Sequence, residues 1–312
     1  MLGHFTNFGC GLKMRLFNQI IHGNNLDVLS KMKKEVVDLT ITSPPYRNAI
    51  DYNTHVKNGH KSDNNYRGKL SITLQKYISE MNRIFQEVFR VTKEGGYCCI
   101  IIGNEINKGT LEPLPALLST EMIKHEWKLH EEIIWHKVTG GANRAGSFVQ
   151  HPYPSYFRAN IMHEKILVMR KGKNNLRRMK YAFEKLNPVV WKEIANSVWH
   201  IAPVPPGFLE HPCPFPEEIP YRLANLYSYE DDVILDPFNG AGQTTKVAHY
   251  LKRKYVGIDI QEKYVKYAKK RLKEEPHLRH ESLMLHFKDD LSSIPSWNKV
   301  KTFSEKRLDE FK

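Results

Sequence analysis

A strand–turn–helix–strand unit in the last third of the sequence constrains the fold more than any other feature. Residues Val233–Asp236 form a short apolar run, and a turn with two glycines follows. A helical pattern then leads to a second apolar run at Tyr255–Asp259. Two short strands joined by a helix form a parallel pair. Because strand and helix patterns also alternate elsewhere, we predict an α/β fold whose mostly parallel sheet carries helices on both faces.

The turn inside this unit has the composition of a nucleotide-type site. Gly240 and Gly242 allow the backbone to approach a ligand closely, and the following helix N-terminus offers N–H groups to a carboxylate. Asp259 ends the second strand, where an acidic residue can accept hydrogen bonds from both hydroxyls of a ribose. By itself, such a turn is also compatible with a purely structural role.

A second unusual segment follows the apolar run Val37–Thr42 and reads Ser43-Pro44-Pro45-Tyr46. Each proline fixes its own φ angle and lacks an N–H, and it keeps the preceding residue out of the helical region. The segment therefore predicts a rigid ledge at a strand end, with one hydroxyl, fixed carbonyl acceptors and one aromatic ring. Such a ledge suits the binding of a planar amine, although Pro-Pro-Tyr alone also occurs in turns and proline-rich ligands.

Other hydrophobic patterns complete the predicted fold. An amphipathic helix is predicted from Leu74 to Val91, and a shorter one from about Pro216 to Tyr227. No helical pattern separates the strands near 131–137 and 164–170, so we expect an antiparallel hairpin at a sheet edge. The full set of predicted strands lies near 17–22, 37–42, 97–102, 131–137, 164–170, 233–236 and 255–259.

The net charge favours a polyanionic partner. The chain has 312 residues and a formal net charge of +13, which suits binding to a phosphate backbone. Lys165–Lys180 carries seven basic residues and no acid, and we expect this segment to contact the phosphate backbone. For the second basic cluster, Lys263–Lys273, we favour a solvated surface.

No membrane association or export is predicted. No apolar run reaches the roughly 18–20 residues of a membrane span, and Met1–Lys13 has no apolar signal core. The four cysteines contain no Cys-x-x-Cys pair, and Cys98 and Cys99 are expected on opposite faces of one strand. We therefore expect a cytoplasmic protein without disulfides. The histidines show no metal-ligand spacing, so no metal site is predicted.

Taken together, the two motifs resemble those of the DNA amino-methyltransferases, which move a methyl group from S-adenosylmethionine to an exocyclic nitrogen of a base. Here the Ser-Pro-Pro-Tyr motif precedes the glycine motif, an order that resembles the permuted β class, with target recognition between the motifs. Further similar segments, in matching order, are Ile20–Asn24, Phe85–Gly96, Trp135–Lys137, His163–Leu167 and His211–Glu218. The resemblance covers roughly residues 15–273.

The resemblance implies a Rossmann-like methyltransferase fold and assigns roles to matching residues. Ser43 and the Pro44 carbonyl would accept hydrogen bonds from the target amine, and Tyr46 would stack on a base flipped out of the duplex. The implied catalytic residues are Ser43, Pro44, Pro45 and Tyr46. The implied S-adenosylmethionine contacts are Asn24, Asp236, Phe238, Asn239, Gly240, Gly242, Thr244 and Asp259. The implied contacts to double-stranded DNA are Arg47, Arg144, Arg177 and Arg178.

Ser43 also bears on the target base. In the family that the motif resembles, serine at this position is typical of cytosine-N4 enzymes and aspartate is common among adenine-N6 enzymes. The residue favours cytosine N4 and leaves adenine N6 open. Asn24, where the family often has aspartate, and Gln243, in place of the usual glycine, depart from the pattern.

Two alternatives from other functional classes also remain open. The permuted motif order and the basic segment argue against an RNA or protein methyltransferase. The presence of Ser43 and Asp236 argues against an inactive DNA-binding relative.

The resemblance suggests five parts of the chain. We expect a leader at 1–14, a catalytic half at 15–137, a target-recognition region at 138–200, a cofactor-binding half at 201–275 and an extension at 276–312. The resemblance also allows for a partner restriction endonuclease that cuts at the same DNA site.

Overall fold

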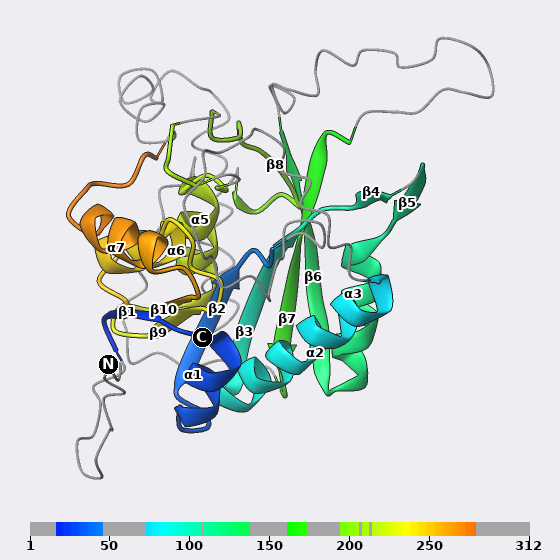
Figure 1. The fold of residues 1–312 in the computed structure, drawn as a ribbon, viewed down its shortest axis with the longest axis horizontal. Helices are drawn as coiled ribbons and strands as arrows, with labels where there is room; N and C mark the ends of the chain where they lie inside the picture. Colours follow the sequence, from blue (N-terminus) through cyan, green and yellow to red (C-terminus); the bar gives the residue numbers. More distant parts are fainter. Residues whose placement is uncertain are drawn as a thin grey trace, which may run out of the picture. The chain divides into compact units, whose positions relative to one another are not determined.

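The computed structural model describes residues 17–45, 73–107, 109–137, 161–173, 194–205, 208–211 and 214–278. Contacts divide the chain into two units, Met1–Pro276 and His277–Lys312, and the fold below belongs to the first. In its described part, one eight-stranded sheet has the order β1-β10-β9-β2-β3-β7-β6-β8 (Figure 1). Its strands are β1 (Gln19–His22), β2 (Val37–Thr42), β3 (Thr92–Ile102), β6 (Trp127–His136), β7 (His163–Lys171), β8 (Val198–His200), β9 (Val233–Asp236) and β10 (Lys254–Asp259).

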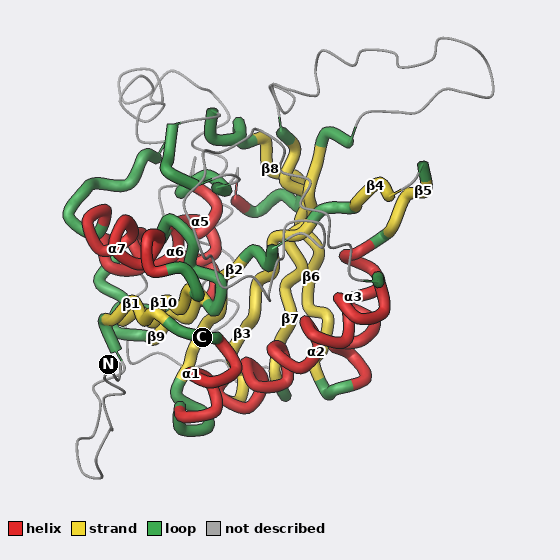
Figure 2. The backbone as a smooth tube through the Cα atoms, viewed as in Figure 1, coloured by secondary structure: helices red, strands yellow, loops and turns green. Residues whose placement is uncertain are grey.

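Most of the sheet is parallel. From β1 to β3 each strand runs parallel to its neighbour, whereas β7 runs antiparallel to both β3 and β6. Figure 2 shows β3, β7 and β6 side by side. The predicted α/β fold with an antiparallel hairpin edge is therefore confirmed, although β3 and β6 begin earlier than the sequence patterns suggest, and β8 adds a parallel strand beyond β6.

The crossover connections leave the middle of the sheet in opposite directions. Strand β9 leads through helix α6 (Gln243–Tyr250) to β10, whereas β2 leads through α2 (Leu74–Val91) to β3 on the other side. Open parallel sheets bind ligands beyond the carboxyl ends of their strands at such a switch point. A ligand site is therefore expected near Thr42 and Asp236, the last residues of β2 and β9.

The helices form two groups (Figure 1). One contains α1 (Asn25–Lys31), α2 and α3 (Leu114–Lys124), and the other contains α5 (Glu218–Tyr227), α6 and α7 (Glu262–Arg271). Helix α2 has the predicted bounds and buries the predicted apolar stripe, which includes Tyr77, Met81, Phe85 and Val88. Its N-terminus is capped by the side chain of Thr73.

A core cluster lies between α1–α3 and the sheet. It includes Tyr77, Phe85 and Cys98, whereas the adjacent Cys99 is buried outside this cluster. Successive residues of a strand point to opposite faces, so this is the predicted arrangement. Both cysteines are free thiols, and burial raises the pKa of each well above its usual value.

The sequence patterns do not predict five of the described elements. These are β8, helices α1 and α3, and a separate hairpin of β4 (Glu105–Asn107) and β5 (Thr110–Glu112). Strands of three residues are too short to show a period of two. In the described part of the chain, no helix combines the length and the apolarity needed to cross a membrane.

Candidate active site

The Ser-Pro-Pro segment begins where β2 ends. Strand β2 is buried along its whole length, so the segment leaves the sheet from its interior. Pro44 is buried, and Ser43 and Pro45 are half-buried. Tyr46 and Arg47, for which base stacking and DNA binding are predicted, lie outside the described residues.

The glycine turn begins where the neighbouring strand β9 ends. Gly240 and Gly242 have φ angles of +48° and +83°, which L side chains rarely adopt. A Cβ atom on Gly242 would lie 2.7 Å from the Cβ of Ala268, and one on Gly240 would lie 2.8 Å from Nε2 of His211. The turn therefore needs glycine at both positions for conformation and for space.

Asp236 joins the ends of the two strands. Its Oδ1 accepts a hydrogen bond of 2.6 Å from the Thr42 hydroxyl and one of 3.0 Å from the Phe238 backbone N–H. Burial raises the pKa of Asp236 to about 6, although both bonds favour the ionised form. Residues separated by 194 positions in the chain are thus in direct contact at the switch point.

Asp259 ends β10, on the other side of β9. Its Oδ2 accepts a 2.8 Å hydrogen bond from the Gly240 N–H, and its Oδ1 accepts one of 2.8 Å from the Gln261 N–H. Burial raises the pKa of this carboxyl, and the two backbone bonds lower it. The predicted ribose-binding acid therefore contacts the glycine turn directly.

Asn24 lies near this strand end because β1 pairs with β10. The preceding residue, Gly23, donates its N–H to the Asp259 carbonyl at 3.0 Å. Asn24 itself is exposed, and its Oδ1 accepts a 2.9 Å hydrogen bond from the Leu26 N–H. It therefore caps the N-terminus of α1, a structural role that the sequence patterns do not predict.

Two buried side-chain amides at the turn have a nitrogen without a partner in the described part of the chain. They are Asn239 Nδ2 and Gln243 Nε2. Asn239 Oδ1 is occupied, since it accepts a 2.9 Å hydrogen bond from the Thr245 hydroxyl. Buried polar groups are generally hydrogen-bonded, so these two nitrogens are groups that a polar ligand in the turn would satisfy.

Thr244 forms a second link between the two halves. Its hydroxyl donates to the Ile41 carbonyl in β2 at 3.1 Å. The same hydroxyl lies close enough to Asp236 to lower the pKa of that carboxyl. The side chain of this predicted cofactor residue therefore also contacts β2, the strand that leads into the predicted amine-binding ledge.

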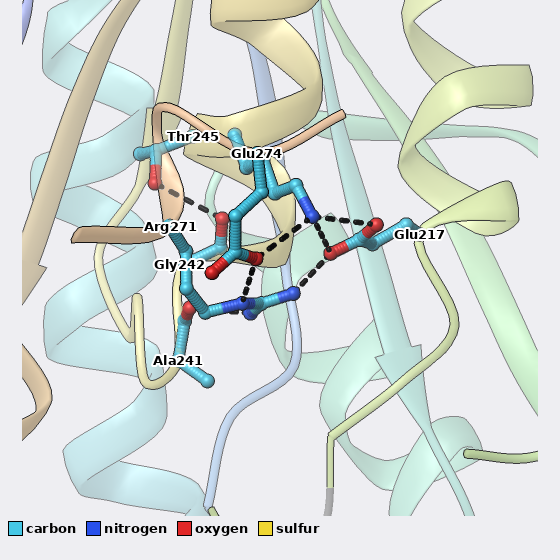
Figure 3. Close-up of polar contacts among 7 residues, drawn as sticks. Glu217, Ala241, Gly242, Thr245, Arg271 and Glu274 are labelled. Carbon is cyan, nitrogen blue, oxygen red and sulfur yellow. Dashed lines mark hydrogen bonds and ion pairs between the residues drawn. The ribbon is translucent and has the colours of Figure 1, made fainter. Parts of the chain in front are cut away.

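Behind the glycine turn lies a buried ionic network that the sequence analysis does not predict (Figure 3). Arg271 donates to the Ala241 carbonyl at 2.6 Å and pairs with Glu217. Lys246 lies 3.1 Å from Glu217 and 3.4 Å from Glu274. Because the side chains of Arg271, Lys246 and Glu217 are 1%, 0% and 4% exposed, their charges compensate one another inside the protein.

Two basic residues of the charged clusters are buried, contrary to what the sequence predicts. Arg271, expected on a solvated surface, belongs to the buried network. Lys171, in the segment expected to contact DNA, is buried and donates to the Phe89 and Thr92 carbonyls at 3.0 and 2.8 Å. The other members of the second cluster, Lys263, Lys266, Lys269, Lys270 and Lys273, are exposed. Arg144, Arg177 and Arg178 lie outside the described residues.

The described histidines do not form a metal centre. Where the structure describes the chain, no group of three His, Cys, Asp or Glu side chains could hold a metal ion. His136 and His200 share a 2.9 Å hydrogen bond between their Nδ1 atoms at the ends of β6 and β8. Burial lowers the pKa of His211 to about 4, so its ring packs on the glycine turn in the neutral form.

Comparison with known proteins connects this arrangement to one family. A family model named N6_N4_Mtase and described as DNA methylase matches residues 37–270. The type II methyltransferase M.ScaI of Streptomyces caespitosus is 29% identical over 274 residues, which cover 82% of this chain and 81% of that protein. The type II methyltransferase M.HpaI of Haemophilus parainfluenzae is 27% identical over 267 residues, covering 82% and 74% of the two chains.

Solved structures share the fold. TTHA0409 of Thermus thermophilus, a putative DNA modification methylase complexed with S-adenosyl-L-methionine, superposes with a TM-score of 0.63 at 24% identity. The match covers 81% of this chain and 92% of that one. The cytosine-N4-specific PvuII DNA methyltransferase gives a TM-score of 0.62 at 18% identity and covers 84% and 88%. At these identities the likeness establishes the fold.

Proposed function

The chain belongs to the N6_N4_Mtase family of DNA methylases, and on this premise we propose that it methylates the exocyclic N4 of cytosine in double-stranded DNA. S-Adenosylmethionine, the proposed methyl donor, supplies an electron-poor methyl group on a sulfonium. The observation that carries methyl transfer is the 2.6 Å contact of Thr42 with Asp236, whereas the choice of cytosine N4 rests on Ser43 and the resemblance of its motif. The contact sets the predicted amine-binding ledge beside the predicted cofactor turn, as transfer between two bound reactants requires.

In this proposal, the ledge that follows β2 binds the target amine. The Ser43 hydroxyl oxygen and the Pro44 carbonyl accept its two N–H groups, which favours a tetrahedral nitrogen with an exposed lone pair. Pro45 keeps the ledge rigid, and Tyr46 stacks on the base. Flipping the base costs a few kcal/mol, whereas positioning two reactants can contribute on the order of 7–11 kcal/mol.

We assign cofactor binding to the glycine turn and the strand ends beside it. Asp236 and Phe238 take the methionine side, and Asp259 takes the ribose. The amide nitrogens of Asn239 and Gln243, which have no partner among the described residues, support a polar ligand at this turn. The complete proposed set is Asn24, Asp236, Phe238, Asn239, Gly240, Gly242, Thr244 and Asp259.

We further propose that the chain is of the permuted β class and takes part in restriction–modification. In this class, the segment between the two motifs recognises the DNA sequence, which here is the region 138–200. Arg47, Arg144, Arg177 and Arg178 are the proposed DNA contacts. The type II methyltransferases among the relatives support a pairing with an endonuclease that cuts at the same site.

Mass spectrometry of nucleosides tests the proposal. Unmethylated DNA incubated with the protein and S-adenosylmethionine should gain N4-methylcytosine. Ser43→Ala should slow the reaction by a factor on the order of 10²–10³, as expected for a lost transition-state hydrogen bond. Ser30→Ala, at an exposed position of α1, is the matched control.

The other outcomes are equally informative. N6-methyladenine would retain the enzyme class and overturn the assignment of the base. If folded protein that binds the cofactor forms neither methylated nucleoside, DNA is overturned as the substrate.

A further inference from the structure

The contact between β2 and β9 changes from backbone pairing to side-chain bonding near the candidate site. Backbone pairing between these strands ends at Thr40 and Leu235. The last residues of the strands, Thr42 and Asp236, meet through their side chains instead. The connection across the switch point is therefore made by side chains, at the place where the two reactants are proposed to meet.

Two hydroxyls hold the end of β2, one through a bond to β9 and the other from the first turn of α6. Thr42 donates to Asp236 at 2.6 Å, and Thr244 donates to the Ile41 carbonyl at 3.1 Å. Thr42 is 0% exposed, and Thr244 and Asp236 are each 1% exposed. A short hydrogen bond to a carboxylate is among the stronger ones, and burial limits competition from solvent donors. The two strand ends are thus fixed to each other rather than merely adjacent.

We propose that Thr42 is a positioning residue, whose hydroxyl fixes Ser43 and the ledge relative to the cofactor turn through Asp236. This inference rests on the proposed function. Thr42 is buried and acts through its neighbours, since Ser43 follows it directly in the chain. A misplacement of about 1 Å can reduce a transfer rate by about 100-fold, so loss of this hydroxyl should slow the reaction.

The same bond gives a pH signature. The bonds from Thr42, Phe238 and Thr244 lower the pKa of Asp236, whereas burial and the carboxylate of Asp259 raise it. The proposed cofactor is cationic, so its binding beside Asp236 favours the ionised carboxylate. Without the Thr42 hydroxyl, this pKa should rise above about 6. The acid limb of cofactor binding, which is the pH range where affinity falls because Asp236 becomes protonated, would then move to higher pH. The loss of a residue with only a structural role would not move it.

Three variants of the full chain test the proposal. Thr42→Val keeps the shape of the side chain and removes the donor, and Thr42→Ser keeps the donor. Thr40→Val is the matched control, because Thr40 is buried in the same strand and its Oγ1 has no partner within the described ranges. The readouts are S-adenosylmethionine affinity across the range around pH 6 by calorimetry, and the single-turnover rate of methyl transfer to DNA.

We expect Thr42→Val to be about 100-fold slower, with its acid limb moved to higher pH, and the other two variants to match the wild type. The proposal is overturned if Thr42→Val keeps the wild-type limb, or if Thr40→Val loses as much. Should Thr42→Val not fold, Thr42→Cys supplies a weaker donor, and an unmoved limb in that variant would also overturn it.

Failure of the proposed function would be recognisable separately. Wild-type protein that binds S-adenosylmethionine without methylating DNA would contradict the proposed function. The acid limb of cofactor binding would still distinguish Thr42→Val from Thr42→Ser if the Thr42 bond tunes Asp236.

Discussion

At the scale of single residues, Asp236 lies at the centre of the candidate site, and its buried carboxylate lowers the stability of the folded protein. Burial raises its pKa from 3.8 to about 6. When the folded pKa of an acid exceeds the unfolded one, the native state binds the proton more tightly. The contribution of Asp236 to stability therefore falls as the pH rises from 3.8 to about 6.

Asp236→Asn should consequently stabilise the folded protein at neutral pH. Asparagine keeps Oδ1 as an acceptor for Thr42 and Phe238 but carries no charge. One pKa unit corresponds to about 1.4 kcal/mol, so the gain at about pH 7 is on the order of 3 kcal/mol and should vanish near about pH 4. Urea unfolding at both pH values measures it.

Asp231→Asn is the control for this experiment, because the Asp231 side chain is 77% exposed. It should show no comparable dependence on pH. A less stable Asp236→Asn variant at neutral pH would mean that the buried carboxylate is favourable. Loss of cofactor affinity in a stabilised variant would be the expected trade of function for stability.

Residue roles could be predicted from the sequence only where a motif carries them. Ser43, the glycines and the two acids stand out through their neighbours in the chain. Thr42 does not, because a threonine in a strand is common and its partner is distant in the sequence. Arg271 does leave a signal, since it follows Val265 and Ala268 at spacings of three on the buried side of α7. A basic residue on an apolar stripe indicates a buried ion pair.

At the scale of elements, the buried network ties three segments to the glycine turn. Arg271 comes from α7, Lys246 from α6 and Glu217 from the residue that precedes α5. The 2.6 Å bond from Arg271 holds the Ala241 carbonyl between the two glycines of the turn. The conformation of the turn therefore depends in part on α7, a helix that carries none of the predicted cofactor residues.

Arg271→Met should destabilise the protein by about 3–5 kcal/mol, because it removes one partner from a buried ionic group. It should also weaken S-adenosylmethionine binding, since the turn loses its support. Lys270→Met, at the neighbouring exposed position, should change stability by less than about 0.5 kcal/mol. Thermal unfolding and calorimetry compare the two, and equal melting curves would show that the network contributes nothing.

The predictability of each element followed its length and the strength of its pattern. Helix α2 could be placed to the residue, because its apolar positions recur over about five turns. Strands β4, β5 and β8 have three residues each, and their pairing comes from tertiary contacts. Helix α1 has only seven residues and depends on the cap from Asn24.

At the scale of the whole molecule, the sequence indicated the fold class but not how its parts join. Alternating strand and helix patterns were enough to predict a mostly parallel sheet. The adjacency of β2 and β9 follows only from the assembled sheet, in which they meet at Leu39↔Ile234 and Thr40↔Leu235. Asp38 secures the other end of this join, where its Oδ2 accepts a 2.9 Å bond from the Val233 N–H.

The position of β1 has a consequence for the order in which the protein folds. Its recorded neighbour in the sheet is β10, the last of the described strands to be synthesised, and the bond from Asn18 to Tyr255 spans 237 residues. Contacts of such separation form late, after local ones. In pulse-labelled hydrogen exchange during refolding, Ile20 should gain protection together with its β10 partner Gly257 and after α2. Earlier protection of Ile20 would contradict this order. A ribosome that has already made the Ser-Pro-Pro-Tyr segment therefore holds the proposed amine-binding motif without the strands around it, and the candidate site can assemble only when β10 has emerged.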